Sequence, residues 1–175
     1  DVAIAKQHRP MLVNAYDNSV RYTDYVLSGI IDYLGSLENT SSALLYCADH
    51  GEDLIDDHRE RFLHASPTTT AYQLYVASLA WFSESYRERF PEKVAAAEAN
   101  ATAPATTHAL FHTMADMASI RGRFLTTKVS LVSPDFDRTA PRRYLNDHNE
   151  AVPYRKTGLR PEDTEVFRRY GIELN

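Results

Sequence analysis

The sequence predicts an α/β fold, and two neighbouring patterns carry that prediction. Apolar residues recur at steps of three and four from residue 11 to 37, as in one long amphipathic helix. After a polar break, residues 43–48 form a short apolar run without polar alternation. Such a run is typical of a strand buried on both faces, as in the middle of a parallel sheet. A helix followed by such a strand is a signature of α/β proteins.

The long helix has recognisable ends and one apolar face. Pro10 suits a helix start, and Gly35 suits a helix end. The predicted face consists of Leu12, Tyr16, Val20, Leu27, Ile30, Ile31 and Leu34.

Shorter patterns predict the next elements. Residues 49–70 are polar and irregular, and a loop of that length inside a compact domain is usually functional or disordered. Gln73 to Phe82 is rich in Tyr, Val, Leu and Trp and predicts a second strand. Ser85 to Phe90 predicts a short helix ending at Pro91, whereas the alanine-rich residues 92–103 suit either a helix or a mobile excursion.

The rest of the chain gives weaker signals. Residues 106–119 predict an amphipathic helix with Leu110, Phe111, Met114 and Met117 on its apolar side. Further on, Pro and Arg become frequent and periodicity fades. We therefore divide the chain into residues 1–132 and a C-terminal tail, 133–175. The tail is expected to pack on the domain or to be partly extended, with one helix near 161–170.

Composition excludes some classes of protein. The net charge of -5 and the scattered basic residues argue against a nucleic-acid binder. No apolar run approaches the roughly 20 residues that span a bilayer. The single cysteine, Cys47, excludes an internal disulfide.

The residues that could carry chemistry follow the predicted strand. Asp49 and His50 offer one oxygen and one nitrogen donor, a mixture that suits zinc, and Gly51 permits a sharp turn. A capping aspartate beside a surface histidine is the alternative. His64 lies in the same loop and could bind a second ion, contact a phosphate or act as a general acid. Its alternative is a structural, partly buried histidine.

Four segments resemble a known family. Asp49-His50-Gly51-Glu52 after an apolar strand, followed by Leu63-His64, is similar to the signature of the bacterial phosphoethanolamine transferases. These enzymes belong to the alkaline phosphatase/sulfatase superfamily. Residues 13–27 resemble the helix before that strand in the family, and residues 81–86 and 110–113 resemble later blocks. The resemblance runs in order from about residue 11 to 120.

The resemblance implies an alkaline-phosphatase-like α/β/α sandwich, of which this chain holds a C-terminal portion with only part of the central sheet. It implies a zinc-dependent transferase that moves phosphoethanolamine from a phospholipid to lipid A or another cell-surface glycan through a threonine nucleophile. Asp49 and His50 would be zinc ligands, His64 would face the substrate phosphate or a second zinc, and Glu52 would lie nearby. The location would be the periplasm, in a protein of the inner membrane.

The departures from the family also carry expectations. In the family the threonine and another acidic zinc ligand lie upstream of the helix at residue 11. We therefore expect an incomplete zinc site, no activity in this chain alone, and membrane contact only through N-terminal helices outside it. An exposed sheet edge would favour self-association. Residues 53–61 depart from the commoner family pattern.

Two alternatives stay open: a sulfatase or phosphodiesterase of the same superfamily, and a non-catalytic module that kept the scaffold.

Overall fold

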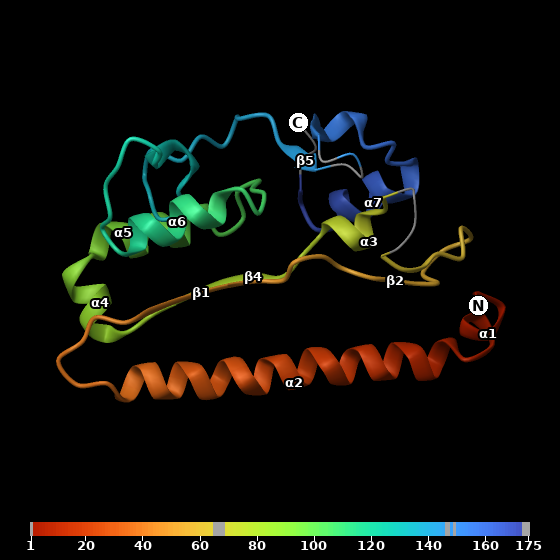
Figure 1. The fold of residues 1–175 in the computed structure, drawn as a ribbon, viewed down its shortest axis with the longest axis horizontal. Helices are drawn as coiled ribbons and strands as arrows, with labels where there is room; N and C mark the ends of the chain where they lie inside the picture. The colour runs from red at the N-terminus through yellow and green to blue at the C-terminus, as the bar shows by residue number, and fades with distance from the viewer. Residues whose placement is uncertain (1, 65–68, 146–147, 149, 173–175) are drawn as a thin grey trace.

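The computed structural model describes residues 2–64, 69–145, 148 and 150–172. Three layers are visible (Figure 1). After the short helix α1 (Val2–Gln7), the long helix α2 (Arg9–Ser36) runs along one face of a ribbon made of β1 (Ala43–Cys47) and β4 (Ser78–Phe82). On the other face lie α5 (Pro91–Asn100) and α6 (Ala109–Met117). This arrangement confirms the expected α/β/α sandwich with part of a central sheet.

Helix α2 matches the predicted helix within two residues at each end, and Pro10 lies in its first turn. Leu12, Tyr16 and Leu27 are half-buried, as expected for the face toward the ribbon. Val20 and Ile30 belong to the predicted face but are exposed. The two strands of the ribbon have 5 residues each, whereas α2 has 28, so the ribbon covers only part of the length of the helix.

Strand β1 is present as predicted, but its environment differs from the prediction. It pairs antiparallel with β4, with Ala43 opposite Phe82 and Cys47 opposite Ser78. All its residues are half-buried rather than buried, because β4 is the only strand paired with it among the described residues. The expectation of a strand in the middle of a parallel sheet is therefore wrong for this structure.

The second predicted strand is shorter than expected. Its first part forms a separate helix, α3 (Ala71–Leu74), and β4 begins only at Ser78. Thr70 caps α3, since its hydroxyl accepts the N–H of Gln73 at 3.4 Å.

The main core lies between the ribbon and the helices that follow it. Helix α4 (Glu84–Arg89) confirms the predicted short helix, and α5 resolves the uncertain alanine-rich stretch as helical. The Tyr86 hydroxyl donates to the carbonyl of Met117 at 2.7 Å, which ties α4 to the end of α6. The buried apolar residues of this core are Phe82, Tyr86, Val94, Met117 and Val132.

Helix α6 is present, but its predicted apolar face is wrong. Met117 is buried, whereas Phe111 and Met114 are exposed. The buried side instead carries polar residues, among them His112 and Thr113. Thr113 Oγ1 accepts the N–H of Leu131 at 3.0 Å, and His112 Nδ1 accepts that of Thr126 at 3.3 Å. These side chains face inward because they satisfy backbone groups of the segment packed beside the helix.

The tail builds a second core. After a 3₁₀ turn, η1 (Thr127–Val129), the chain forms the hairpin β5 (Arg143–Leu145) and β6 (Ala151–Pro153) and a second turn, η2 (Tyr154–Lys156). Helix α7 (Pro161–Arg169) agrees with the predicted helix near 161–170. Its Phe167 is buried together with Ala71 of α3 and Tyr154. The division of the chain at residue 132 stays a prediction.

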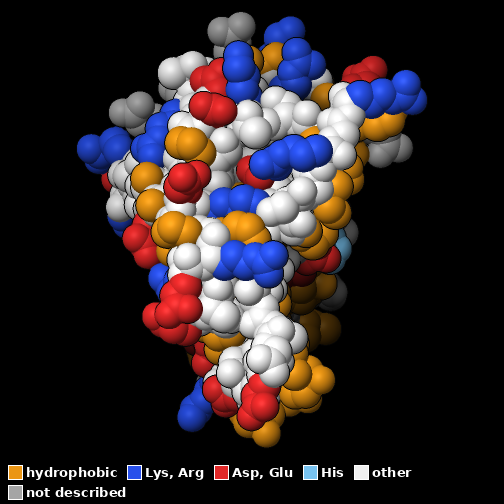
Figure 2. Space-filling model, turned by 90° about the vertical axis from the view of Figure 1, so that its left-hand side faces the viewer, with side chains coloured by type: hydrophobic (Ala, Val, Ile, Leu, Met, Phe, Trp, Pro, Cys, Tyr) orange, Lys and Arg blue, Asp and Glu red, His pale blue; other side chains and the backbone are white. Residues whose placement is uncertain are grey.

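The surface carries charges of both signs. Figure 2 shows the end of the molecule where α4 lies, with Lys and Arg side chains gathered in the upper part and Asp and Glu among and below them. Within the described residues, no helix combines the length and apolar character needed to cross a membrane.

Candidate metal centre

The candidate site lies in the loop that follows β1, residues 49–64, which we call the metal loop. It contains a small hairpin whose strands are β2 (Asp53–Leu54) and β3 (Phe62–Leu63). Asp53 is opposite Leu63 in this hairpin. Because Glu52 precedes the first of these residues and His64 follows the second, the hairpin register brings Glu52 and His64 side by side.

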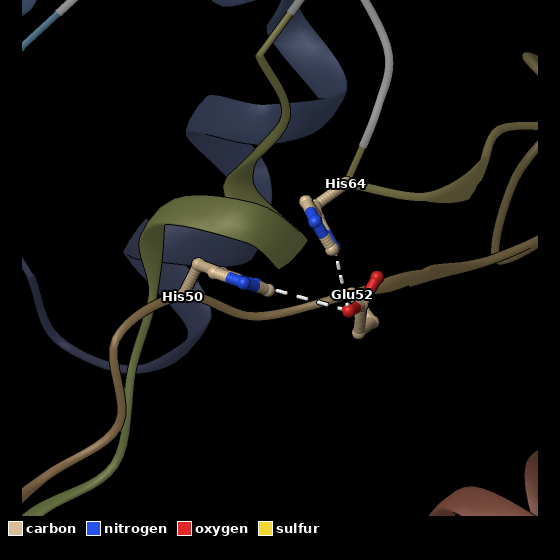
Figure 3. Close-up of side chains that lie close together, drawn as sticks. All are labelled: His50, Glu52 and His64. Atoms are coloured by element: carbon tan, nitrogen blue, oxygen red, sulfur yellow. Dashed lines mark hydrogen bonds and ion pairs between the residues drawn. The ribbon is translucent and has the colours of Figure 1, made fainter.

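Three side chains of the loop converge (Figure 3). His64 Nδ1 lies 2.8 Å from Glu52 Oε1, and His50 Nδ1 lies 3.8 Å from the same oxygen. The centroids of the two imidazole rings are 3.9 Å apart. One potential ligand atom from each of the three residues lies within 4.8 Å of the others. Two imidazoles and a carboxylate form a donor set that suits zinc.

Asp49 is not part of this group, although it adjoins His50. Its side chain is 89% exposed, and its Oδ2 lies 3.6 Å from His50 Nε2. Two zinc bonds of about 2.1 Å at a tetrahedral angle place their ligand atoms about 3.4 Å apart. The backbone N–H of His50 donates to Asp49 Oδ1 at 3.0 Å and lowers the pKa of this carboxyl group. Asp49 is therefore ionised at neutral pH, as a ligand must be.

The hydrogen bonds favour one tautomer of each histidine, with the proton on Nδ1. His50 Nδ1 lies 3.1 Å from the carbonyl oxygen of Gly51, which can only accept, so the proton belongs on Nδ1. Glu52 likewise accepts from His64 Nδ1. Both contacts leave the two Nε2 atoms as acceptors or ligands, the pattern of carboxylate–histidine pairs around metals. Glu52 Oε2 is buried and has no hydrogen-bond partner among the described residues, which also fits a nearby cation.

Helix α3 supports the start of the loop. The N–H of Gly51 donates to the carbonyl of Gln73 at 2.9 Å. A Cβ on Gly51 would lie 1.9 Å from the carbonyl oxygen of Tyr72, so only glycine fits. Asp53, which is buried, accepts from Thr70 Oγ1 at 2.8 Å and from the side-chain amide of Gln73. Burial raises the pKa of Asp53 despite these two hydrogen bonds.

The hairpin is conformationally unusual. Ile55, Glu60 and Leu63 have positive φ angles of 59°, 52° and 59°. Positive φ is uncommon outside glycine and strained for a β-branched residue such as Ile55. Arg9 Nε of α2 lies 2.9 Å and 2.8 Å from the carbonyl oxygens of Leu54 and Ile55, which holds this strained turn.

The structure therefore groups three of the four residues that the sequence singled out and leaves Asp49 beside them. The sequence contained no sign that Glu52 pairs with His64, because the pairing depends on a hairpin with strands of two residues each. His58, in the same loop, lies apart from this group, with its Nε2 3.6 Å from Glu162 of α7.

The chain is similar to known proteins in sequence. The sequence profile described as sulfatase matches residues 4–120. Phosphoethanolamine transferase EptA from Salmonella typhimurium is 30% identical over 127 residues, which are 70% of this chain and 23% of that protein. Kdo(2)-lipid A phosphoethanolamine 7''-transferase from Escherichia coli is 35% identical over 82 residues, 46% of this chain and 14% of that protein.

Solved structures show the same fold. The C-terminal periplasmic domain of EptC from Escherichia coli aligns with a TM-score of 0.68 at 23% identity, over 82% of this chain and 40% of that one. A complex of that domain with Zn aligns with a TM-score of 0.65 at 24% identity and the same coverage. The chain spans less than a quarter of the two curated relatives and about two fifths of the solved domains.

Proposed function

The chain belongs to the sulfatase family, whose profile covers residues 4–120, and from this premise we propose that it forms part of the catalytic domain of a zinc-dependent phosphoethanolamine transferase. The observation that carries the proposal is the convergence of His50, Glu52 and His64 directly after β1. The curated relatives are named as phosphoethanolamine transferases, which favours this activity over sulfate-ester or phosphodiester hydrolysis.

We assign the proposed ligands from the orientation of the side chains. Asp49 Oδ2 and His50 Nε2 lie 3.6 Å apart and would bind one zinc ion between them. Glu52 would orient the imidazole of His64 through its Nδ1 atom, and the carbonyl of Gly51 would orient that of His50. Direct binding of the ion by His50, Glu52 and His64 is the second possible ligand set.

His64 is the proposed catalytic residue. Glu52 holds a proton on His64 Nδ1, so His64 Nε2 is free to accept the proton of an acceptor hydroxyl, and the imidazolium that results could donate a hydrogen bond to a phosphoryl oxygen. Zinc, when bound, would offset the negative charge on phosphoryl oxygens and on an attacking oxygen.

The donor, the acceptor and the location belong to the same proposal. We propose phosphatidylethanolamine-type lipids as donors, and lipid A or a related surface glycan as acceptor, in the periplasm. A relative named for transfer to Kdo(2)-lipid A and neighbours named as periplasmic domains support these assignments. Because the threonine nucleophile is assigned to residues outside this sequence, a polypeptide of these 175 residues alone is expected to show no transfer of phosphoethanolamine.

Zinc binding tests the site. Affinity and stoichiometry would be measured by calorimetry and metal analysis on the unaltered chain and on its Asp49→Asn, His50→Ala and Glu52→Gln variants. His58→Ala is the matched control, because His58 lies in the same loop with an exposed side chain. We expect weak binding to the unaltered chain, loss of binding in His50→Ala, and no change in His58→Ala.

The order of the two carboxylate variants assigns the ligand. A larger loss in Asp49→Asn than in Glu52→Gln identifies Asp49 as the ligand, and the reverse order identifies Glu52. Equal affinities in His50→Ala and His58→Ala, or no zinc on the unaltered chain, would count against a metal site in this loop.

A further inference from the structure

We propose that Arg59 and Asp163 are positioning residues for the metal loop, so that the C-terminal helix α7 holds the candidate metal ligands in place. The inference rests on the proposed function of His50, Glu52 and His64. It concerns a part of the chain beyond residue 120, where the sulfatase profile ends.

The contact between the two residues is bidentate and buried. Arg59 Nη1 donates to Asp163 Oδ2 and Nη2 donates to Oδ1, each at 2.8 Å. The Asp163 side chain is fully buried and that of Arg59 is 10% exposed. Arg59 also contacts Asp57 of the loop, with its Nε 3.0 Å from both carboxylate oxygens. Charge-assisted, bidentate pairs of this kind fix geometry more strictly than a single hydrogen bond does.

The carboxylate of Asp163 joins two parts of the site at once. The carboxylate accepts hydrogen bonds from Arg59, in the turn of the hairpin, and from the backbone N–H of Ala71 at 2.9 Å. Ala71 begins α3, whose next two residues contact Gly51 through their carbonyl groups. Asp163 therefore holds the hairpin and the helix that supports the start of the metal loop in one fixed relation.

The backbone of the hairpin needs such support. Ile55 and Glu60, with positive φ angles, lie on either side of Arg59. Conformations of this kind persist only where the surrounding contacts hold them. Since Glu52 and His64 flank the hairpin directly, relaxation of its turn would move the two side chains whose contact is 2.8 Å in the structure.

The test compares two variants with a control on the same helix. Asp163→Asn removes the carboxylate charge, and Arg59→Lys keeps the charge of residue 59 but removes the bidentate fork. The control is Glu165→Gln, which removes an exposed carboxylate of α7 whose partner is Arg168 at 2.8 Å. Loss of one partner of a buried pair leaves a buried charge, so Asp163→Asn is the more severe change and Arg59→Lys is the milder one.

Four readouts separate a local effect from global unfolding. The single tryptophan, Trp81 of β4, reports on the ribbon through its fluorescence. Hydrogen exchange of the Gly51 and Ile55 amides, both bonded to backbone carbonyls, reports on the metal loop. Zinc affinity reports on the site, and the visible absorption of Co²⁺ bound in place of zinc reports on ligand geometry.

With unchanged Trp81 fluorescence, we expect the loop amides to exchange at least about tenfold faster in Arg59→Lys. We expect zinc affinity to fall about 10- to 100-fold, with an altered Co²⁺ spectrum. Glu165→Gln should match the unaltered chain. If Arg59→Lys also matches the unaltered chain in amide exchange, zinc affinity and Co²⁺ spectrum, the proposal is overturned.

A failure of the proposed function gives a different result. If the unaltered chain binds no zinc but its loop amides exchange faster in Arg59→Lys, the metal assignment fails and the support of the loop by α7 stands.

Discussion

Gly51 is required for a close approach rather than for an unusual backbone conformation. The sequence suggested a sharp turn at this glycine, but positive φ angles among the described glycines occur only at Gly158 and Gly171. What excludes a side chain is the carbonyl oxygen of Tyr72, 1.9 Å from where a Cβ would lie. Since that oxygen belongs to the backbone of α3, it cannot turn away as a flexible side chain could.

We therefore expect Gly51→Ala to destabilise the chain by about 1 to 3 kcal/mol, the usual cost of overpacking. Thermal unfolding should show a Tm lower by about 2 to 4 °C for each kcal/mol. Gly122→Ala is the control, because nothing lies within 4 Å of a Cβ placed there. Equal Tm values for the two variants would show that α3 can shift away from the loop.

At the level of single residues, the sequence indicates candidate ligands but not their hydrogen-bond partners. Asp49 and His50 are candidates because they follow an apolar strand directly, and their role as ligands stays a prediction. The pairing of Glu52 with His64 could not be predicted, because it follows from a hairpin closed by residues with positive φ. A β-branched residue such as Ile55 gives no local signal for that conformation.

Among the elements, those with long or clear patterns were predictable. Helix α2 and strand β1 have many periodic or consecutive apolar residues, and the tail helix α7 starts at a proline. The face of α6 was not predictable from hydrophobicity. Its polar residues point inward to bond with the segment 126–131, a contact that no periodicity within the helix encodes.

Strand β1 also carries a prediction about association. Among the described residues it pairs on one edge only, with β4. Free strand edges offer unpaired N–H and C=O groups to another chain. We therefore expect the 175-residue chain to self-associate with rising concentration, which sedimentation velocity would measure. A monodisperse monomer at all concentrations would contradict edge pairing and would favour the non-catalytic module.

For the molecule as a whole, the C-terminal segment is a structural part of the candidate site. Phe167 and Tyr154 form a core with Ala71, next to the helix residues that contact Gly51. The sequence predicted a helix near 161–170 but gave no reason to connect it with the metal loop. That connection depends on an ion pair between residues 104 positions apart, and single-sequence patterns extend over far shorter distances.

This ion pair predicts how stability depends on pH. Burial alone raises the pKa of Asp163, but hydrogen bonds from Arg59 and from two backbone N–H groups outweigh it and lower the pKa. Arg59 likewise lowers the pKa of Asp57. Carboxyl groups with lowered pKa values stabilise the folded chain fully above their unfolded pKa, about 3.9. This stabilisation is lost as the pH falls through the folded pKa.

Urea unfolding between pH 7 and pH 3, followed by Trp81 fluorescence and by the exchange of the loop amides, would measure this loss. We expect the free energy of unfolding to decrease below about pH 4, and to decrease less in Asp163→Asn. Asp53, whose pKa is raised by burial, acts in the opposite direction. An equal decrease with and without the Asp163 carboxyl group would assign the acid sensitivity to other groups.

The distance along the chain between Arg59 and Asp163 also orders events during protein synthesis. At about 5 to 20 residues per second, the ribosome adds the 104 positions between them in about 5 to 20 s. For nearly all of that interval a nascent chain contains His50 and His64 but lacks the helix that holds their loop. Trypsin should therefore cut nascent chains stalled before α7 at Arg59 and Arg61 and spare chains that already include α7, so the metal loop would mature only after α7 has been made.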